Sequence, residues 1–178
     1  MSLQHNRTIL AVDPGINGAM ALFIDGRAEL VVDMPTVIQR VNRNHRRHPD
    51  TWALSSIMAA AIAHAGERPL LVCERVSATP RDGSSRAFVF GRFFQSVRQC
   101  AACYGLDERT VPPATWKHRL RLSSDKKQSL AMARELFPGF TNRLARDKDD
   151  GRAEALLIGH WYLEHGQAYF EESTDDAV

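Results

Sequence analysis

Cysteine is scarce in this sequence. Its three cysteines, Cys73, Cys100 and Cys103, are too few and too odd in number for a disulfide framework. Cys100 and Cys103 form a C-x-x-C pair, but no second pair accompanies it and it falls within a helical pattern, so we interpret these thiols as reduced packing residues rather than zinc ligands or a redox centre. The cysteine content therefore predicts a cytoplasmic location.

Long apolar runs and a large charge imbalance are also missing. No run approaches the roughly 20 apolar residues of a membrane span, and the first seven residues hold no apolar core of a secretory signal, so we expect no membrane partner. Hydrophobic residues make up 44% and charged residues 25%, which is typical of a globular protein. We expect one domain over residues 1–178, with flexible tails at 1–6 and 167–178.

Basic residues are concentrated in particular segments, although the net charge is only +2. Arginines without acids occupy Pro35–Pro49, and further basic residues dominate Arg81–Arg98 and Lys117–Lys127, whereas the chain from Glu164 onward is acidic. Such segregation suits a polyanionic partner, although each segment alone is also compatible with a solvated face. The predicted nucleic-acid-binding residues are Arg40, Arg43, Arg46, Arg47, Arg81, Arg86, Arg92, Lys117, Lys126 and Lys127.

Apolar runs predict the strands of an α/β fold. Thr8–Val12, Ala19–Ile24 and Ala28–Asp33 form an antiparallel meander, with Asp25-Gly26 as a hairpin turn. A strand at Pro69–Val76 follows a helix, so a crossover connection places it parallel to the first strand. A short edge strand at Arg109–Val111 completes a mixed five-stranded sheet with helices on both faces.

Helical patterns and one irregular segment fill the rest of the chain. Met34 to Pro49 shows no periodicity and is expected to be a polar connection. The predicted helices cover Thr51–His64, Ser84–Tyr104, a short stretch from Pro113, about Asp125–Leu136 and a last helix from near Asp149.

Four carboxylates are expected to converge at one edge of this sheet. Asp13 ends the first strand and Glu74 lies near the end of the parallel strand beside it, where open α/β sheets place their chemistry. Asp150 and Glu154 are four residues apart on one helix face, which they share with apolar residues, so both should point inward. The alternatives are a turn-capping role for Asp13 and a salt bridge from Glu74 to a nearby arginine. All-oxygen clusters suit Mg²⁺ or Mn²⁺, and two such ions ~4 Å apart promote phosphodiester hydrolysis.

Five segments carry a further signal through their order in the chain: Ile9–Gly15, Cys73–Val76, Phe90–Arg92, Pro113–Lys117 and Asp150–Ile158. Together they resemble RuvC-type Holliday-junction resolvases of the ribonuclease-H-like superfamily, particularly bacteriophage members. The resemblance implies a homodimer that cuts two strands of a four-way DNA junction, with the long Phe-rich helix as a candidate dimer contact.

The same resemblance implies that Asp13, Glu74, Asp150 and Glu154 are the catalytic and metal-binding residues, with two Mg²⁺ or Mn²⁺ ions. Bacterial members space the last two acids three apart rather than four, which leaves Asp147 and Asp149 as alternatives to Asp150 and allows Lys148 to assist. From helical geometry we predict Asp150 as the ligand and Asp149 as a solvent-facing or capping acid.

Three other classes of function share features of this sequence. A sugar kinase or actin-like ATPase requires a second similar domain and a Gly-rich adenosine loop, which this chain does not contain. In a non-catalytic nucleic-acid-binding module, the expected convergence of the four acids would have to be a coincidence. A ribonuclease H or a flap nuclease would use the same chemistry, and the sequence leaves that choice of substrate open.

Overall fold

The computed structural model describes residues 8–41, 44–75 and 83–175. The predicted five-stranded mixed sheet is confirmed, with strand order β3-β2-β1-β6-β7. β1 and β2 pair antiparallel, as do β2 and β3, whereas β6 is parallel to β1 and β7 is parallel to β6. The strands of this sheet are β1 (Ile9–Asp13), β2 (Ala19–Ile24), β3 (Arg27–Asp33), β6 (Leu70–Glu74) and β7 (Glu108–Val111).

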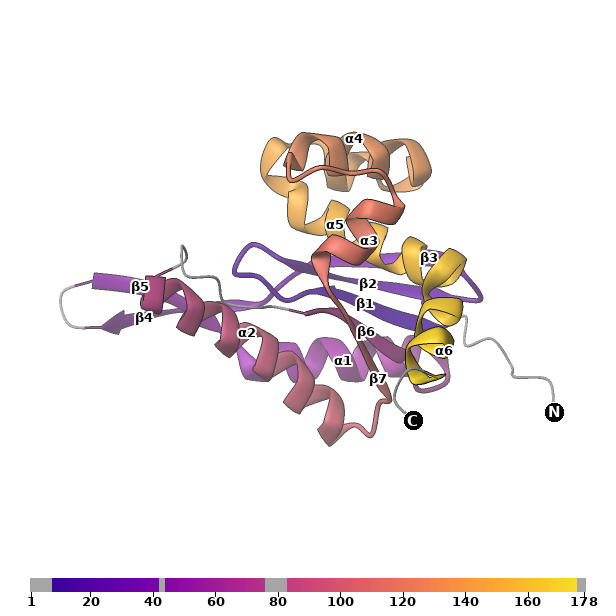
Figure 1. The fold of residues 1–178 in the computed structure, drawn as a ribbon. Helices are drawn as coiled ribbons and strands as arrows, with labels where there is room; N and C mark the ends of the chain where they lie inside the picture. Colours follow the sequence, from indigo (N-terminus) through magenta and orange to yellow (C-terminus); the bar gives the residue numbers. More distant parts are fainter. Residues whose placement is uncertain (1–7, 42–43, 76–82, 176–178) are drawn as a thin grey trace.

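Helices cover both faces of the sheet, as predicted (Figure 1). The helices are α1 (Thr51–Ala65), α2 (Gly83–Cys103), α3 (Pro113–Arg119), α4 (Lys126–Leu136), α5 (Asp150–Trp161) and α6 (Gln167–Asp175), with 3₁₀ turns at Pro138–Leu144 and Asp147–Asp149 and a π-helical turn at Tyr162–Gly166. None of the described helices is long and apolar enough to cross a membrane.

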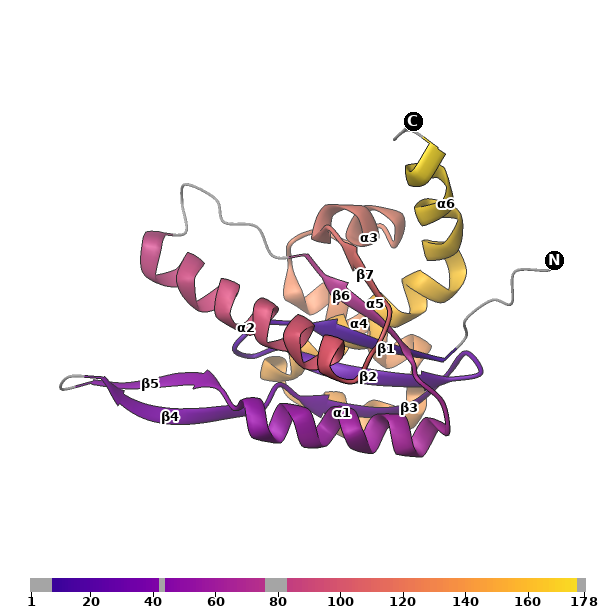
Figure 2. The same cartoon turned by 90° about the horizontal axis from the view of Figure 1, so that it is seen from below.

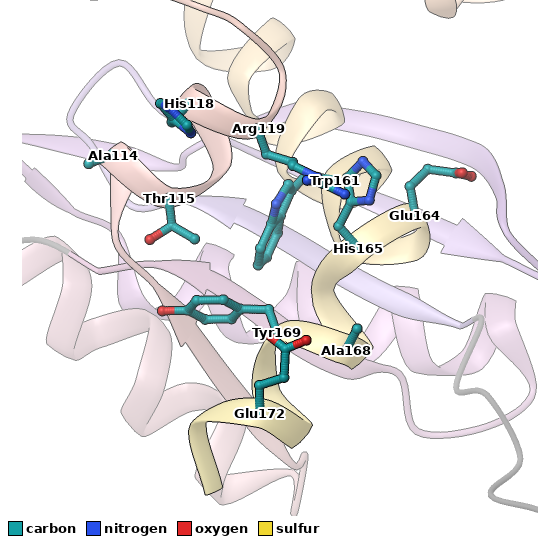
Figure 3. A pocket seen from close by; sticks show the side chains of 10 residues that line it. All are labelled: Ala114, Thr115, His118, Arg119, Trp161, Glu164, His165, Ala168, Tyr169 and Glu172. Carbon is teal, nitrogen blue, oxygen red and sulfur yellow. The ribbon is translucent and has the colours of Figure 1, made fainter. Parts of the chain in front are cut away.

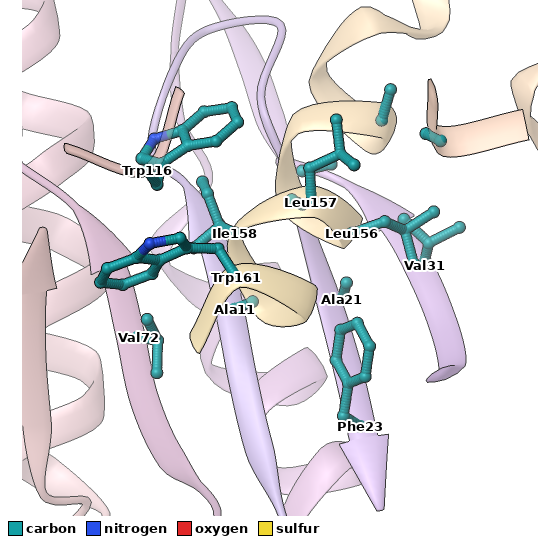
Figure 4. Close-up of a cluster of buried hydrophobic side chains, with 14 of the residues drawn as sticks. Ala11, Ala21, Phe23, Val31, Val72, Trp116, Leu156, Leu157, Ile158 and Trp161 are labelled. Carbon is teal, nitrogen blue, oxygen red and sulfur yellow. The ribbon is translucent and has the colours of Figure 1, made fainter. Parts of the chain in front are cut away.

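Alternating side chains of the strands build a separate core on each face. Leu10 and Val12 of β1 pack with Leu54 of α1 and Phe93 of α2 on one side. On the other side, the intervening residues of β1 and β2 pack under α5, whose apolar residues are almost entirely buried (Figure 4). Because α5 lies directly on the central strands, its first turn is fixed at the sheet edge where β1 and β6 end.

The segment between β3 and α1 differs from the prediction. Residues expected to form an irregular connection fold into a two-stranded hairpin, β4 (Thr36–Val41) and β5 (Asn44–Pro49). Figures 1 and 2 show it extending outward from the main sheet, on the same side as the start of α2. The hairpin packs little of its surface into a core, and Ile38 is 66% exposed. Because neither of its faces packs extensively into a core, its strands do not need the alternation of apolar and polar residues by which a half-buried strand is recognised.

The C-terminal segment also differs. Residues 167–178 were expected to form a flexible tail, but α6 occupies Gln167–Asp175 and packs Tyr169 and Phe170 against Trp161, with ring centroids 5.7 and 6.4 Å away. Two aromatic contacts thus anchor a segment whose polar, acidic composition suggested a tail. The N-terminal tail predicted at 1–6 lies outside the described residues.

Candidate active site

The turn between β1 and β2 places Asp13 at the carboxyl edge of the sheet. Gly18 donates its amide to the Gly15 carbonyl at 2.9 Å, which closes the turn. A Cβ atom on Gly18 would lie 2.0 Å from the Asp13 carbonyl oxygen, so only glycine allows the chain to return this closely past Asp13. The tight turn leaves the Asp13 side chain facing a cavity of about 610 Å³.

A second close approach brings the start of α5 to the same turn. A Cβ atom on Gly151 would lie 2.0 Å from the carbonyl oxygen of Asn17, so the helix backbone rests directly on the turn backbone. Arg152, the next residue, holds Asp33 at the end of β3 through two hydrogen bonds of 2.6 Å. These contacts fix the helix that carries Asp150 and Glu154.

Three of the four predicted acids line one cavity, which we call the acidic cavity. Asp13 from β1, Glu74 from β6 and Glu154 from α5 all border it, together with the basic side chains of Arg75, Arg86 and Lys126. Asp150 is buried, is not among the residues that line this cavity, and contacts the Lys126 ammonium group. The structure thus brings Asp13, Glu74 and Glu154 together at one cavity, and Asp150 joins them through its contact with Lys126.

Glu74, Asp150 and Glu154 each have a hydrogen-bond partner that the sequence did not reveal. The Trp116 indole donates to Glu74 Oε2 at 2.7 Å, so the arginine partner considered for Glu74 is replaced by an indole. Lys117 Nζ lies 2.7 Å from Glu154 Oε1 and also lies over the Trp116 ring. Lys117 and Lys126, predicted as phosphate-binding residues, therefore lie among the carboxylates.

The electrostatics of the cavity reflect crowded negative charge. Burial, followed by repulsion from Glu74 and Glu154, raises the pKa of Asp13 well above its usual range, although Lys126 and Lys117 oppose the shift. Burial also raises the pKa of Glu74 to about 7, against the hydrogen bond from Trp116. Burial disfavours the charged form of Lys126, but the hydrogen bond and attraction of Asp150 and its neighbours outweigh it and raise the Lys126 pKa.

The donor set suits hard cations, although it is not arranged as a finished metal centre. Within the described ranges, no three His, Cys, Asp or Glu side chains are placed so as to hold an ion. Clustered carboxylates that raise one another's pKa values nevertheless favour added positive charge, and all-oxygen ligands match Mg²⁺ or Mn²⁺. The residues present therefore fit such ions, while the two lysines neutralise part of the charge.

The burial and contacts of the residues that precede α5 distinguish the roles predicted for them. Asp149 is 4% exposed, so the predicted solvent-facing position is wrong. Its carboxylate accepts hydrogen bonds from the Arg146 backbone amide at 2.8 Å and from the Arg146 guanidinium at 2.7 Å, which is the capping arrangement that was the other predicted role. Burial opposes the charge, but these bonds hold the pKa of Asp149 below its usual value. Asp147 and Lys148 are exposed.

The predicted nucleic-acid-binding residues fall into several groups. Arg40, Arg46 and Lys127 are exposed, and Arg86 lines the acidic cavity. Arg47 and Arg92 are engaged elsewhere: Arg47 bonds to the β1–β2 turn and Arg92 contacts His48. Arg43 and Arg81 lie outside the described residues.

A larger cavity lies between α3, the π-helical turn and α6 (Figure 3). Its volume is about 720 Å³, and Trp161 and Tyr169 contribute aromatic surface to it. None of the four predicted acids lines it, and basic and acidic side chains, such as Arg119 and Glu164, share its wall. This mixed lining selects no class of ligand, so the acidic cavity remains the candidate active site.

Known proteins resemble this chain in sequence and in fold. No protein-family model matches the chain. Over 116 residues, 62% of its length, the chain is 36% identical to "Holliday junction resolvase MOC1, chloroplastic" from Chlamydomonas reinhardtii, but it spans only 13% of that relative.

Two solved structures share the fold. One is the Thermus thermophilus RuvC in complex with Holliday junction substrate, with a TM-score of 0.53, 14% identity, and coverage of 90% of this chain and 95% of that chain. The other is described as the Thermus thermophilus RuvC structure, with a TM-score of 0.51, 12% identity, and coverage of 89% and 96%. The ribonuclease-H-like fold of RuvC is therefore confirmed, and so is the resemblance to RuvC-type resolvases. The bacteriophage branch and the cytoplasmic location stay predictions.

Proposed function

We propose that this protein is a metal-dependent, structure-selective endonuclease that nicks four-way DNA junctions. The observation that carries the proposal is the convergence of Asp13, Glu74 and Glu154 on one cavity that basic side chains also line. The sequence relative is a Holliday junction resolvase by name, and the RuvC of the same fold is bound to a junction, which supports DNA junctions as the substrate.

Two Mg²⁺ or Mn²⁺ ions are the proposed cofactors, held by Asp13, Glu74, Asp150 and Glu154. Bound ions of this kind activate a water molecule and stabilise the leaving oxygen of a phosphodiester. The contribution of the chain is orientation: the Trp116 indole fixes one oxygen of Glu74, and the Gly151 contact fixes the helix that supplies Asp150 and Glu154.

The cavity lysines supply positive charge next to the reacting phosphate. Lys117 and Lys126 hold Glu154 and Asp150, which makes the clustered acids tolerable before the substrate arrives. A phosphodiester that enters the cavity brings a further negative charge to the carboxylates, and the two ammonium groups lie beside these charges. They therefore attract the substrate and offset the repulsion between it and the acids.

The outer basic residues are proposed to bind the DNA backbone. Arg40 and Arg46 are exposed on the hairpin that projects from the sheet, and Arg86 lines the cavity on α2. Lys127 is exposed at the start of α4. Contacts of this type recognise phosphate and shape rather than base sequence, which suits a substrate defined by its branching.

A homodimer is the proposed assembly, because a two-fold symmetric junction matches two identical active sites. α2 is the candidate contact, since its Phe88 side chain is 69% exposed on a helix that otherwise packs Phe93 and Val97 into the core. Sedimentation analysis should give a dimer for the wild type and a larger monomer fraction for Phe88→Ser. A monomer for both would contradict this assembly.

The decisive experiment compares cleavage of a synthetic four-way junction, a flap, a plain duplex and an RNA–DNA hybrid, each with Mg²⁺, Mn²⁺ or a chelator. We expect symmetric nicking of the junction, dependent on the metal. Asp13→Asn, Glu74→Gln and Glu154→Gln should each abolish cleavage while junction binding persists. Glu29→Gln, an exposed acid of β3, serves as the matched control.

Each alternative gives its own result in this assay. Preference for the hybrid or the flap would assign a different nuclease of the same fold. Binding without cleavage of any substrate would indicate a non-catalytic module. Near wild-type cleavage by Glu74→Gln would show that the acidic cavity is not the active site.

A further inference from the structure

Arg47 connects the hairpin to the turn that carries Asp13. Its Nη1 donates to Asn17 Oδ1 and its Nη2 donates to the Ile16 carbonyl oxygen, both at 2.9 Å. Its Nε lies 3.2 Å from Thr36 Oγ1 on the opposing strand of the hairpin. One guanidinium group therefore holds two atoms of the β1–β2 turn and one atom of β4.

The turn held by Arg47 is the same one that supports the acidic site. Ile16 and Asn17 lie between Gly15 and Gly18, which close the turn by a hydrogen bond and border the acidic cavity together with Asp13. The Asn17 carbonyl group is also the part of the turn that lies closest to Gly151 of α5. A shift of this turn would consequently displace both Asp13 and the first turn of α5.

The neighbouring residue of β5 contacts a different element. Successive residues of a strand point to opposite faces, and His48 accordingly reaches away from the turn to the Arg92 guanidinium of α2. Two adjacent side chains thus hold the base of the hairpin, one against the β1–β2 turn and the other against α2. The exposed arginines Arg40 and Arg46 lie farther toward the hairpin tip.

We propose that Arg47 is a positioning residue, which holds the Ile16–Gly18 turn and thereby sets Asp13 and α5 for cleavage. The sequence predicted Arg47 as a phosphate contact, but three of its guanidinium nitrogens already donate within the protein. The inference rests on the proposed nuclease function and deepens that function, because Arg47 would couple the hairpin, which is proposed to bind DNA, to the acidic cavity, where cleavage is proposed to occur.

Substitution by lysine separates positioning from phosphate binding. A phosphate contact requires mainly a positive charge, which lysine supplies, whereas the observed contacts require a planar fork with several fixed donors. Arg47→Lys should therefore resemble Arg47→Ala in cleavage rate if Arg47 positions the turn. It should resemble the wild type if Arg47 binds phosphate.

The first measurement is single-turnover cleavage of a four-way junction as a function of enzyme concentration. We expect Arg47→Ala and Arg47→Lys to lower the saturating rate about 10- to 100-fold, because displacements of about 1 Å have such effects, with half-saturation changed less than about threefold. Asn17→Ala should lower the rate as well, and the double variant should lose little more than either single one. Arg27→Ala, an exposed arginine at the far end of the sheet, is the control.

Amide hydrogen exchange gives a second readout that does not depend on cleavage. Residues 15–18 should exchange faster in Arg47→Ala and Arg47→Lys than in the wild type or in Arg27→Ala. If the wild type cuts no junction but this acceleration is found, the proposed function fails while the role of Arg47 in holding the Ile16–Gly18 turn stands. Unchanged exchange, or a rescued rate in Arg47→Lys, would overturn the positioning role and return Arg47 to the phosphate contacts.

Discussion

Replacing Gly151 by alanine tests the close contact between α5 and the β1–β2 turn. The added Cβ atom would lie 2.0 Å from the Asn17 carbonyl oxygen, about 1.4 Å short of an ordinary contact of 3.4 Å. Both sides of the contact are backbone, so no side chain can rotate away and the helix or the turn must move by about 1 Å. Overpacking of this kind costs up to about 3 kcal/mol, and a shift of that size lowers a catalytic rate by about 100-fold.

The matched control is Gly91→Ala in α2. No atom lies within 4 Å of a Cβ built at Gly91, so this variant receives only the helix-propensity gain of about 1 kcal/mol. Gly151→Ala gains up to the same amount from helix propensity but loses up to about 3 kcal/mol through the overlap. The expected net loss is therefore up to about 2 kcal/mol, and the two variants differ by up to about 3 kcal/mol.

Urea denaturation measures this separation directly. A loss of about 2 kcal/mol should also lower the melting temperature of Gly151→Ala by roughly 4–8 °C. Single-turnover cleavage of a junction then tests whether the displaced helix slows the reaction. Equal stability of Gly151→Ala and Gly91→Ala would refute the close contact on which the site geometry depends.

Three further predictions follow from buried groups. Asp149→Asn should lower stability by about 1–3 kcal/mol through its lost charge-assisted hydrogen bonds but keep Mn²⁺ affinity, whereas Asp150→Asn should weaken Mn²⁺ binding measured by calorimetry. Burial lowers the pKa of His160, against attraction from Glu164, so the unfolded chain binds more protons and stability should fall as pH drops below about 6.5. Deleting residues 167–178 should uncover Trp161, increase its quenching by iodide and cost about 2 kcal/mol or more.

Controls and contrary outcomes differ among these three. Loss of Mn²⁺ affinity in Asp149→Asn, with normal affinity in Asp150→Asn, would reverse the two assignments. His160→Gln should flatten the pH dependence of stability whereas exposed His118→Gln should not, and equal slopes would contradict the effect of partial burial on His160. For the C-terminal helix, exposed Glu172→Ala is the control, and unchanged stability of the deletion would restore the interpretation as a tail.

The sheet and its acidic edge were predictable because they follow from local patterns and connection rules. The meander, the crossover to β6 and the breaks at Pro-Gly and Asp-Gly determine which strands are parallel and where Asp13 and Glu74 lie. Helical periodicity placed Glu154 inward for a similar reason. These signals lie in residues close together in the chain.

The remaining parts depend on contacts between distant residues. Trp116 meets Glu74 across 42 positions and Lys117 meets Glu154 across 37, and no spacing rule indicates such pairs. The hairpin was missed because its few apolar residues do not alternate with polar ones: Val37 and Ile38 of β4 are adjacent, and β5 holds only polar residues before Pro49. Of the two roles predicted for Asp149, capping is the one found and solvent exposure is wrong, because a 3₁₀ turn precedes α5 and directs this carboxylate toward Arg146.

The hairpin enters and leaves the fold at neighbouring points. Thr36 pairs with Pro49 at its base, and the Asp50 amide donates to the Pro35 carbonyl at 3.0 Å just below that pair. An insertion with adjoining ends can be lengthened, shortened or exchanged at small cost to the rest of a domain. Under the proposed function, substrate range could therefore diverge in evolution or be re-engineered by grafting at this stem, provided that an arginine equivalent to Arg47 is kept, while the acidic cavity stays unchanged.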